Sequence, residues 1–326
     1  MIIGQIKEDD NKETRTPLTP STIKEITTLG HTVLSSKNIG KKSYYTNKEY
    51  IQSKSQILPN AQIYQQSDII IKFTPPSQHL LKKLSKNQIL ISNFSNNEHL
   101  LSKTIATIIQ LEKIPRTSFY QSIDTLTSQA LPRGYSASLF ALSKSPIIAP
   151  LLYTPSTSLG KAKALIIGAS ITGLEIASMF KKNGATTFIL DVQPSAQELA
   201  TSIGADFIHS TKDFDISSVL KDKDFILSAV NFHNPKNPPI ITLQNLKHLK
   251  KGSILIDTTT NNISIKQAQK ITSTYSFYRN PCFERLCPKT SSILFSSNML
   301  NLIKLIQPFQ DSSINLFPVK PMIYKN

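Results

Sequence analysis

The sequence predicts an α/β protein of two domains, each built around a mainly parallel sheet. Short apolar runs alternate with amphipathic segments along the chain, and this alternation is typical of βαβ units. The chain has 326 residues, which suggests about two domains. Its 39% hydrophobic content is that of a globular protein with a sizeable core.

The first domain is predicted over residues 1–125. It opens with the alternating apolar residues of MIIGQIKE, which indicate a short strand. A helix follows, with Thr19 or Ser21 as its cap and Gly30 at its end. The next elements are a weaker helix, a buried strand, a helix with a strand, and a helix with a short strand: 45–58, 65–77, 77–94 and 96–116.

The second domain is predicted over residues 126–287, and the segment from about 288 to 326 is expected to rejoin the first domain. A long helix, interrupted by Pro132, and a loop rich in Ser, Thr and Pro lead into it. The pattern strand, turn, helix, strand, helix, strand then covers 161–208. Two buried strands and a final amphipathic helix complete the chain: 223–230, 251–260 and 298–309.

The net charge of +16 raises the question of an anionic partner. The lysines are scattered, no basic stripe alternates with aromatic residues and Trp is absent, so we expect no nucleic acid. No apolar run approaches the roughly 20 residues of a membrane span, and the N-terminus does not resemble a signal peptide, so a cytoplasmic location is expected. Cys282 and Cys287 are interpreted as reduced thiols, and no metal site is expected.

The stretch GASITG, residues 168–173, follows a predicted strand and opens a predicted helix. In a dinucleotide-binding turn the first glycine allows the sharp turn, the second lets the pyrophosphate approach, and the third lets the helix pack closely. Gly168 and Gly173 supply the first and third, but Ser170 stands at the second. We expect the Ser170 side chain to crowd the pyrophosphate, at a backbone position that should suit glycine.

Asp191 ends the next predicted strand, where a carboxylate binds the adenosine ribose hydroxyls. An acid at this position disfavours the 2′-phosphate of NADP, so an NAD-type cofactor is predicted. The expected cofactor-binding residues are Gly168, Ala169, Ser170, Ile171, Gly173, Asp191, Val192 and Ala229.

Several stretches resemble one family. NKETRTPLTP is similar to the N-E-x-R-x-x-x-T-P opening of the alanine dehydrogenase and proton-translocating transhydrogenase superfamily. SIGADF and LKKGSILIDTTTNN are similar to that family's S-M-G-A-E-F and to its M-K-P-G-S-V-I-V-D-L-A-A-E-N segment. IPRTSFYQSIDTLTSQ resembles the R-x-x-x-x-Q-x-x-D segment of the NAD(H)-binding component of transhydrogenase, which alanine dehydrogenases lack.

The resemblance implies two Rossmann-like domains that hold NAD(H) in the cleft between them. It implies direct hydride transfer between NAD(H) and NADP(H), the latter on a partner subunit. Arg116, Gln121 and Asp124 are implied to lie beside the nicotinamide and its ribose, with Asp124 fixing Arg116. Membrane and NADP(H)-binding partner subunits, a homodimer, and a place at the inner membrane through those subunits are implied as well.

Departures from the family pattern leave two alternatives open. Gln193, the PKNPP stretch at 235–239 and the TTNN stretch at 259–262 replace family residues, which suits a non-catalytic, degenerate subunit. An amino-acid dehydrogenase like alanine dehydrogenase is the other alternative, because Arg15 and Lys72 stand where a clamp for a substrate carboxylate would be. No histidine lies at the expected place in LISNFSNNEH, and ordinary surface salt bridges are the competing interpretation of the two cations.

Overall fold

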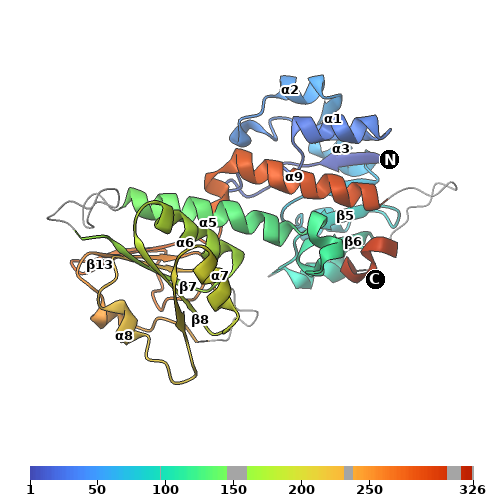
Figure 1. Cartoon of the computed structure of the whole chain (residues 1–326). Helices are drawn as coiled ribbons and strands as arrows, with labels where there is room; N and C mark the ends of the chain where they lie inside the picture. The colour runs from blue at the N-terminus through green and yellow to red at the C-terminus, as the bar shows by residue number, and fades with distance from the viewer. Residues whose placement is uncertain (96, 145–159, 231–237, 307–316, 325–326) are drawn as a thin grey trace. The chain divides into compact units, whose positions relative to one another are not determined.

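The structure is a computed structural model that describes residues 1–95, 97–144, 160–230, 238–306 and 317–324 (Figure 1). The chain divides into two compact units, Met1–Gln129 with Arg285–Asn326, and Ala130–Glu284. We call them unit 1 and unit 2. Within the described residues each unit has a seven-stranded, mainly parallel sheet, which confirms the predicted α/β class.

Unit 1 has the strand order β14-β6-β5-β4-β1-β2-β3, and each pair is parallel except β14 with β6. Its strands are β1 Ile2–Gln5, β2 Thr32–Ser36, β3 Ser55–Leu58, β4 Ile69–Ile71, β5 Ile89–Ser92, β6 Thr107–Gln110 and β14 Ile323–Tyr324. Because β1 lies between β2 and β4, the winding of the chain reverses beside β1. The carboxyl ends of strands at such a reversal form the usual ligand site of open α/β sheets.

The helices of unit 1 begin and end at identifiable caps. Thr19 caps α1 and accepts a hydrogen bond from the Thr22 amide, and Gly30 follows the helix at a φ of +84°. The α-helices are α1 Pro20–Thr28, α2 Asn47–Gln52, α3 Asn60–Gln66, α4 Gln78–Leu81 and α9 Pro288–Leu305. Short 3₁₀ segments cover Lys41–Ser43, Glu98–Lys103, Leu111–Lys113, Ser118–Ile123 and Phe317–Met322.

Two element predictions in unit 1 are wrong. The single helix expected at 45–58 is instead α2 followed by β3, because Lys54 adopts a left-handed φ of 67° and turns the chain between them. The helix expected at the start of 96–116 is only the 3₁₀ segment Glu98–Lys103, none of whose residues is buried. Leu100 and Leu101 are only partly buried against the core, so this segment gains less from packing than a full helix with a buried face would.

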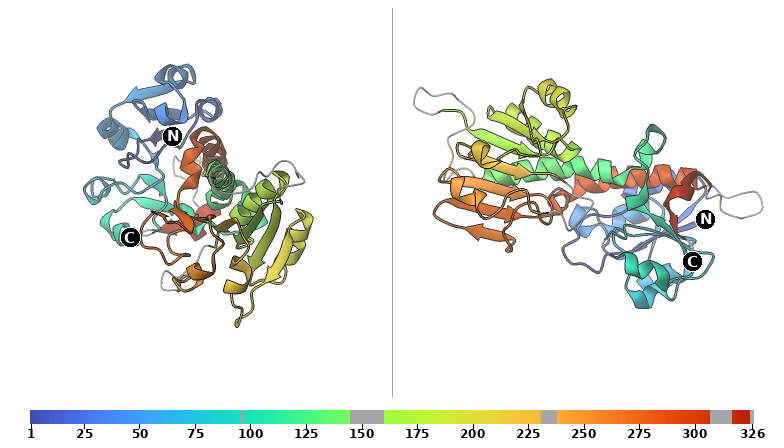
Figure 2. Two further views of the ribbon diagram at one scale, coloured as in Figure 1. Left: turned by 90° about the vertical axis from the view of Figure 1, so that its left-hand side faces the viewer. Right: turned by 90° about the horizontal axis from the view of Figure 1, so that it is seen from below.

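The last helix returns to unit 1. α9 contacts α1 and the segments Lys41–Ser43 and Ser118–Ile123, and it runs beside α1 in both figures (Figures 1 and 2). Its Met299 and Ile303 are fully buried in one core with Ile23 of α1 and Ile3 of β1. The rejoining of the C-terminal segment is thus explained by burial of its apolar residues.

Unit 2 has the strand order β12-β13-β11-β10-β7-β8-β9, parallel except for β12 with β13. Its strands are β7 Lys163–Ile167, β8 Thr186–Asp191, β9 Asp206–His209, β10 Phe225–Ser228, β11 Ser253–Asp257, β12 Gln269–Ile271 and β13 Tyr275–Arg279. The remaining helices are α5 Thr125–Ser143, which begins in unit 1, α6 Ile171–Lys182, α7 Ala196–Ser202 and α8 Ser217–Leu220, with 3₁₀ segments Asn245–His248 and Phe283–Leu286.

Apolar side chains cover both faces of the unit 2 sheet. Ile166, Ile176 and Phe180 belong to one core, and Leu165 and Phe277 belong to another. Adjacent residues of β7 therefore enter different cores, as expected for a parallel strand buried on both sides. Among the described helices, none combines the length and the apolar character needed to cross a membrane.

Candidate functional site

The turn after β7 excludes side chains at two of its positions. Gly168 has a φ of +100°, and a Cβ atom there would lie 2.8 Å from Cγ2 of Val230. A Cβ atom on Gly173 would lie 1.9 Å from the carbonyl oxygen of Gly168. Gly168 therefore permits the turn, and Gly173 lets α6 pack directly against it.

Ser170 is the N-cap residue that precedes α6, and its backbone does not require glycine. Its φ of −64° and ψ of 167° are ordinary extended values, so the expectation that this backbone suits glycine is wrong. The hydroxyl donates to the carbonyl of Ala229 at 2.9 Å and accepts from the amide of Gly173 at 3.3 Å. Ser170 thus caps the helix and ties the turn to the residue that follows β10.

Three backbone amides at the start of α6 have no partner among the described residues. The amides of Ser170, Ile171 and Thr172 donate to no residue in the part of the chain that the structure describes. Such amides carry the positive end of the helix dipole, because the first turn of a helix has no acceptors four residues earlier. This arrangement binds anions, and phosphate groups in particular.

Asp191 ends β8, the strand beside β7, and its carboxylate faces the same turn. Oδ2 accepts from the Ala169 amide at 2.6 Å, and Oδ1 accepts from the Gln193 amide at 2.8 Å. Each oxygen retains acceptor capacity for a further donor. The side chain is partly exposed and Val192 next to it is 63% exposed, so a ligand can reach this carboxylate.

The expected cofactor-binding residues come together at the carboxyl edge of the unit 2 sheet. Their strands β8, β7 and β10 are neighbours, and the winding of the chain reverses between β7 and β10. Ala229 is buried, and besides accepting from Ser170 it donates its amide to Ile167 at 2.8 Å. Most of the PKNPP stretch falls within 231–237 and lies outside the described residues.

The residues expected at the nicotinamide lie in unit 1, around the segment Ser118–Ile123. Asp124 is 4% exposed and caps α5. Its Oδ1 accepts from the amides of Leu126 at 3.0 Å and Thr127 at 3.1 Å, and its Oδ2 accepts from the Thr127 hydroxyl at 2.6 Å.

Arg116 and Gln121 are exposed, and neither side chain bonds to a described residue. The expected pairing of Asp124 with Arg116 is therefore wrong for this structure. The physical reason is that the three donors at the start of α5 already bind the Asp124 carboxylate. Sequence spacing alone did not reveal this cap.

Lys72 lies at the carboxyl edge of the unit 1 sheet, directly after β4, and is fully buried. Its Nζ lies 3.6 Å from Oδ2 of Asp9 and 3.8 Å from Oε2 of Glu8, and it donates to the Lys7 carbonyl at 3.3 Å. Burial raises the pKa of Glu8 above its usual range, although the Lys72 charge acts to lower it.

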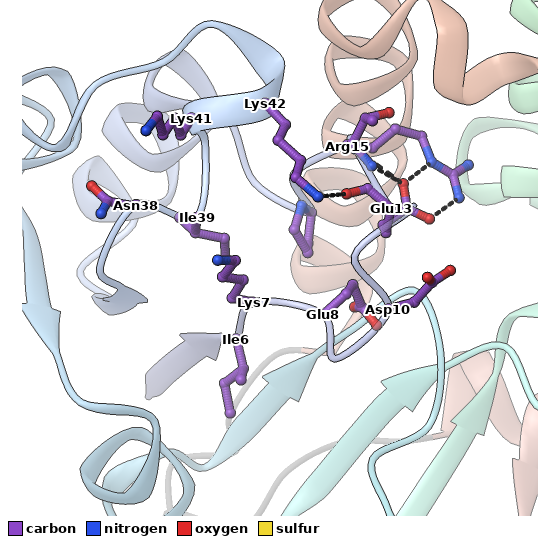
Figure 3. Close-up of a pocket in the computed structure, with 12 residues that line it drawn as sticks. Ile6, Lys7, Glu8, Asp10, Glu13, Arg15, Asn38, Ile39, Lys41 and Lys42 are labelled. Atoms are coloured by element: carbon purple, nitrogen blue, oxygen red, sulfur yellow. Dashed lines mark hydrogen bonds and ion pairs between the residues drawn. The ribbon is translucent and has the colours of Figure 1, made fainter.

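The Arg15 side chain is 8% exposed and lies at the same edge of the unit 1 sheet, where its guanidinium stacks 4.2 Å from the ring centre of Phe73. It binds Glu13 through two bonds of 2.8 Å, drawn as dashed lines in Figure 3, at a cavity of about 180 Å³. Burial acts to raise the pKa of Glu13, but the hydrogen bonds and charge of Arg15, with the charge of Arg285, hold it below its usual value. The surface salt bridges considered for Arg15 and Lys72 are thus wrong, because both cations are buried.

Two family models match most of the chain. Alanine dehydrogenase/PNT, N-terminal domain, matches residues 4–131, and Alanine dehydrogenase/PNT, C-terminal domain, matches residues 150–323. The chain belongs to the alanine dehydrogenase/PNT family. The family resemblance predicted from the motifs is confirmed.

Relatives in this family include both of its branches. The chain is 26% identical over 349 residues to NAD(P) transhydrogenase subunit alpha of Haemophilus influenzae, covering 97% of this chain and 68% of that protein. It is 25% identical over 301 residues to alanine dehydrogenase of Methanococcus maripaludis, covering 87% and 78%.

Solved structures of alanine dehydrogenase/PNT relatives share the fold. A transhydrogenase from Sinorhizobium meliloti matches with a TM-score of 0.89 and 22% identity, covering 100% of this chain and 97% of that one. An L-alanine dehydrogenase matches with a TM-score of 0.81 and 21% identity, covering 94% and 90%. The fold is therefore common to both branches and does not choose between them.

Proposed function

We propose that the chain is the NAD(H)-binding component of a proton-translocating NAD(P) transhydrogenase. The observation that carries this proposal is the turn of unit 2, where free amides at the start of α6 lie beside the Asp191 carboxylate. Relatives at 24–26% identity have names that begin with NAD(P) transhydrogenase subunit alpha, and they support the same assignment.

The residues of the turn fit a dinucleotide. The amides of Ser170, Ile171 and Thr172 would bind the pyrophosphate, and Gly168 leaves the turn without a side chain. Asp191 would accept hydrogen bonds from the adenosine ribose hydroxyls and repel a 2′-phosphate, which favours NAD(H) over NADP(H). NAD(H), when bound, supplies the hydride donor or acceptor.

The proposed nicotinamide contacts are Arg116 and Gln121. Both side chains are exposed and uncommitted, so their donors are available to carboxamide and hydroxyl oxygens. Asp124 acts on their position, because its cap of α5 fixes the end of the segment that carries Gln121. Hydride transfer moves no separate proton, so these residues contribute by orientation.

The proposed partners are a membrane subunit and a subunit that binds NADP(H). The word subunit in the relatives' names supports partners of this kind, and the chain would lie at the inner membrane through them. A homodimer is proposed from the family resemblance alone.

An alanine dehydrogenase activity is less well supported. A substrate carboxylate would need free cations, but Lys72 and Arg15 are paired with Glu8, Asp9 and Glu13. The strand β5 is followed by Asn93, Phe94 and Ser95, with no histidine to move a proton.

A non-catalytic subunit is the second candidate. Gln193 and the TTNN stretch at 259–262 depart from the family pattern, and this favours a chain that keeps the fold and docks its partners. Ser170 gives that candidate no support, because it caps α6 without disturbing the turn.

A reconstituted assay separates these candidates. The full chain is combined with the membrane and NADP(H)-binding components, and reduction of an NAD analogue by NADPH is followed. We expect turnover that depends on this chain. NADH binding without any turnover would favour the non-catalytic subunit, and oxidation of alanine by the chain alone would favour the dehydrogenase.

A further inference from the structure

A buried ion pair lies at the carboxyl edge of the unit 2 sheet, between the last residues of two neighbouring strands. Asp257 ends β11 and is fully buried, and Arg279 ends β13. Arg279 Nε donates to Asp257 Oδ2 at 3.0 Å. An acid at this depth is stable as an anion only when its oxygens are well paired.

The Asp257 carboxylate organises the loop that follows it. Oδ1 accepts from the Thr259 amide at 3.0 Å and its hydroxyl at 2.8 Å. Oδ2 accepts from the amides of Asn262 at 3.1 Å and Ile263 at 3.3 Å. Arg279 also donates to the carbonyls of Ile263 and Ile265, so the loop is held by both partners of the ion pair.

Asn262 connects this loop to the turn after β7. It is 2% exposed, and its Nδ2 donates to the Val230 carbonyl at 2.7 Å. Val230 is the residue whose Cγ2 lies 2.8 Å from the Cβ position of Gly168. The carbonyl of the neighbouring Ala229 accepts a hydrogen bond from the Ser170 hydroxyl. The loop after β11, the end of β10 and the turn after β7 are therefore linked in one chain of contacts.

We propose that Asn262 is a positioning residue for NAD(H). Its amide holds Val230 against the turn, so that the free amides of Ile171 and Thr172 keep the geometry that the pyrophosphate needs. This inference rests on the proposed function of the turn. Without the amide, the partly buried Val230 carbonyl loses its donor, and the turn loses the contact that fixes one side of it.

The test uses the full chain with three single variants: Asn262→Ala, Asn261→Ala and Asp224→Asn. Asn261 is the exposed neighbour and controls for a change in the loop. Asp224 is buried at the opposite, amino edge of the same sheet, where it accepts from the Lys163 amide and from Lys250. Its variant controls for a loss of stability elsewhere in unit 2.

Two quantities are measured well below the unfolding temperature: NADH affinity by calorimetry, and hydrogen exchange of the amides from Ala169 to Gly173 without nucleotide. We expect Asn262→Ala to weaken NADH binding about tenfold and to speed exchange in the turn. Both controls should stay within about twofold of the unmodified chain in affinity.

Unchanged affinity and exchange in Asn262→Ala would overturn the proposal. Equal losses of affinity in Asp224→Asn would also overturn it, since general destabilisation would then explain the effect. If the unmodified chain binds no NADH, the proposed function fails together with the cofactor role of Asn262. Faster exchange in the turn would still reveal the structural link in that case, so the two failures can be told apart.

Discussion

The carboxyl edges of the two sheets are built alike but hold different chemistry. In unit 1 this edge carries Lys72 and Arg15, both buried and both paired with carboxylates. In unit 2 the edge carries a glycine turn whose helix start leaves three amides without a described partner. The same topological position is therefore closed by ion pairs in one unit and open to an anion in the other.

This difference shows that strand order alone does not locate a ligand site. Both sheets reverse their winding beside the first strand of the unit, β1 or β7. What separates them is which polar groups remain uncommitted after folding. On that criterion we propose unit 2 as the nucleotide-binding unit, and the two cations of unit 1 are committed to their carboxylates.

Breaking one buried ion pair in each unit should sharpen the comparison. Lys72→Met leaves Glu8 buried without its ammonium partner, and Asp257→Asn leaves Arg279 without its carboxylate. Each change is expected to cost about 3 kcal/mol in the free energy of unfolding. Calorimetric unfolding measures that cost. Only Asp257→Asn should also weaken NADH binding, so a comparable loss of affinity in Lys72→Met would contradict the assignment of the site to unit 2.

The acid beside the turn should account for cofactor choice. Asp191→Ala removes the acceptor for the ribose hydroxyls and the partner of the Ala169 amide, so NADH affinity should fall about 100-fold. Asp191→Asn keeps an acceptor for the Ala169 amide but removes the negative charge. Comparing the two variants therefore separates the effect of the charge from the effect of a disturbed turn. NADPH affinity should fall less in Asp191→Ala and should not fall in Asp191→Asn, because the charge that repels the 2′-phosphate is removed. A variant that retains the NADH preference would mean that another residue selects the cofactor.

The segment in unit 1 should affect the rate and not the affinity. Arg116→Ala removes a proposed contact to the nicotinamide, and hydride transfer in the reconstituted complex should slow by about 100-fold. NADH affinity should change little, because the adenosine half makes most of its proposed contacts in unit 2. Asp124→Asn is the matched variant, since Asn also caps helices and should leave α5 intact. Asp124→Asn should therefore keep full activity, and full activity in Arg116→Ala would exclude Arg116 from the nicotinamide site.

The smallest expected effect concerns Ser170. Ser170→Ala removes the cap of α6 and should lower the free energy of unfolding by about 1 kcal/mol, while Ser170→Gly should cost only a few tenths. Thermal unfolding of the two variants measures this order. Tighter binding of NADH by Ser170→Gly than by the unmodified chain would mean that the hydroxyl crowds the pyrophosphate after all.

The sequence predicted the elements whose apolar runs are long and continuous. β7, β10 and β11 are buried along most or all of their length, and their patterns indicate strands without ambiguity. β3, β12 and β14 escaped prediction because they are short edge strands with few or no buried residues. Their pairing is decided by neighbouring strands, which local periodicity does not describe.

The same limit applies to the candidate site. Gly168 and Gly173 could be recognised from spacing, since their requirement is local to the turn. The bonds of Ser170 to Ala229 and of Asn262 to Val230 join segments distant in the chain, so only the folded sheet brings them together. Asp124 was misread for a different reason: a carboxylate before a helix can cap it as well as bind an arginine, and the sequence allows both.

The central claim is that unit 2 binds NAD(H) at the turn between Gly168 and Asp191. Calorimetric titration of the full, unmodified chain with NADH and with NADPH tests it most directly. We predict that NADH binds one site per chain, at least about tenfold more tightly than NADPH, because the Asp191 carboxylate accepts ribose hydroxyls and repels a 2′-phosphate. Absence of NADH binding, or equal affinity for the two nucleotides, would contradict the account.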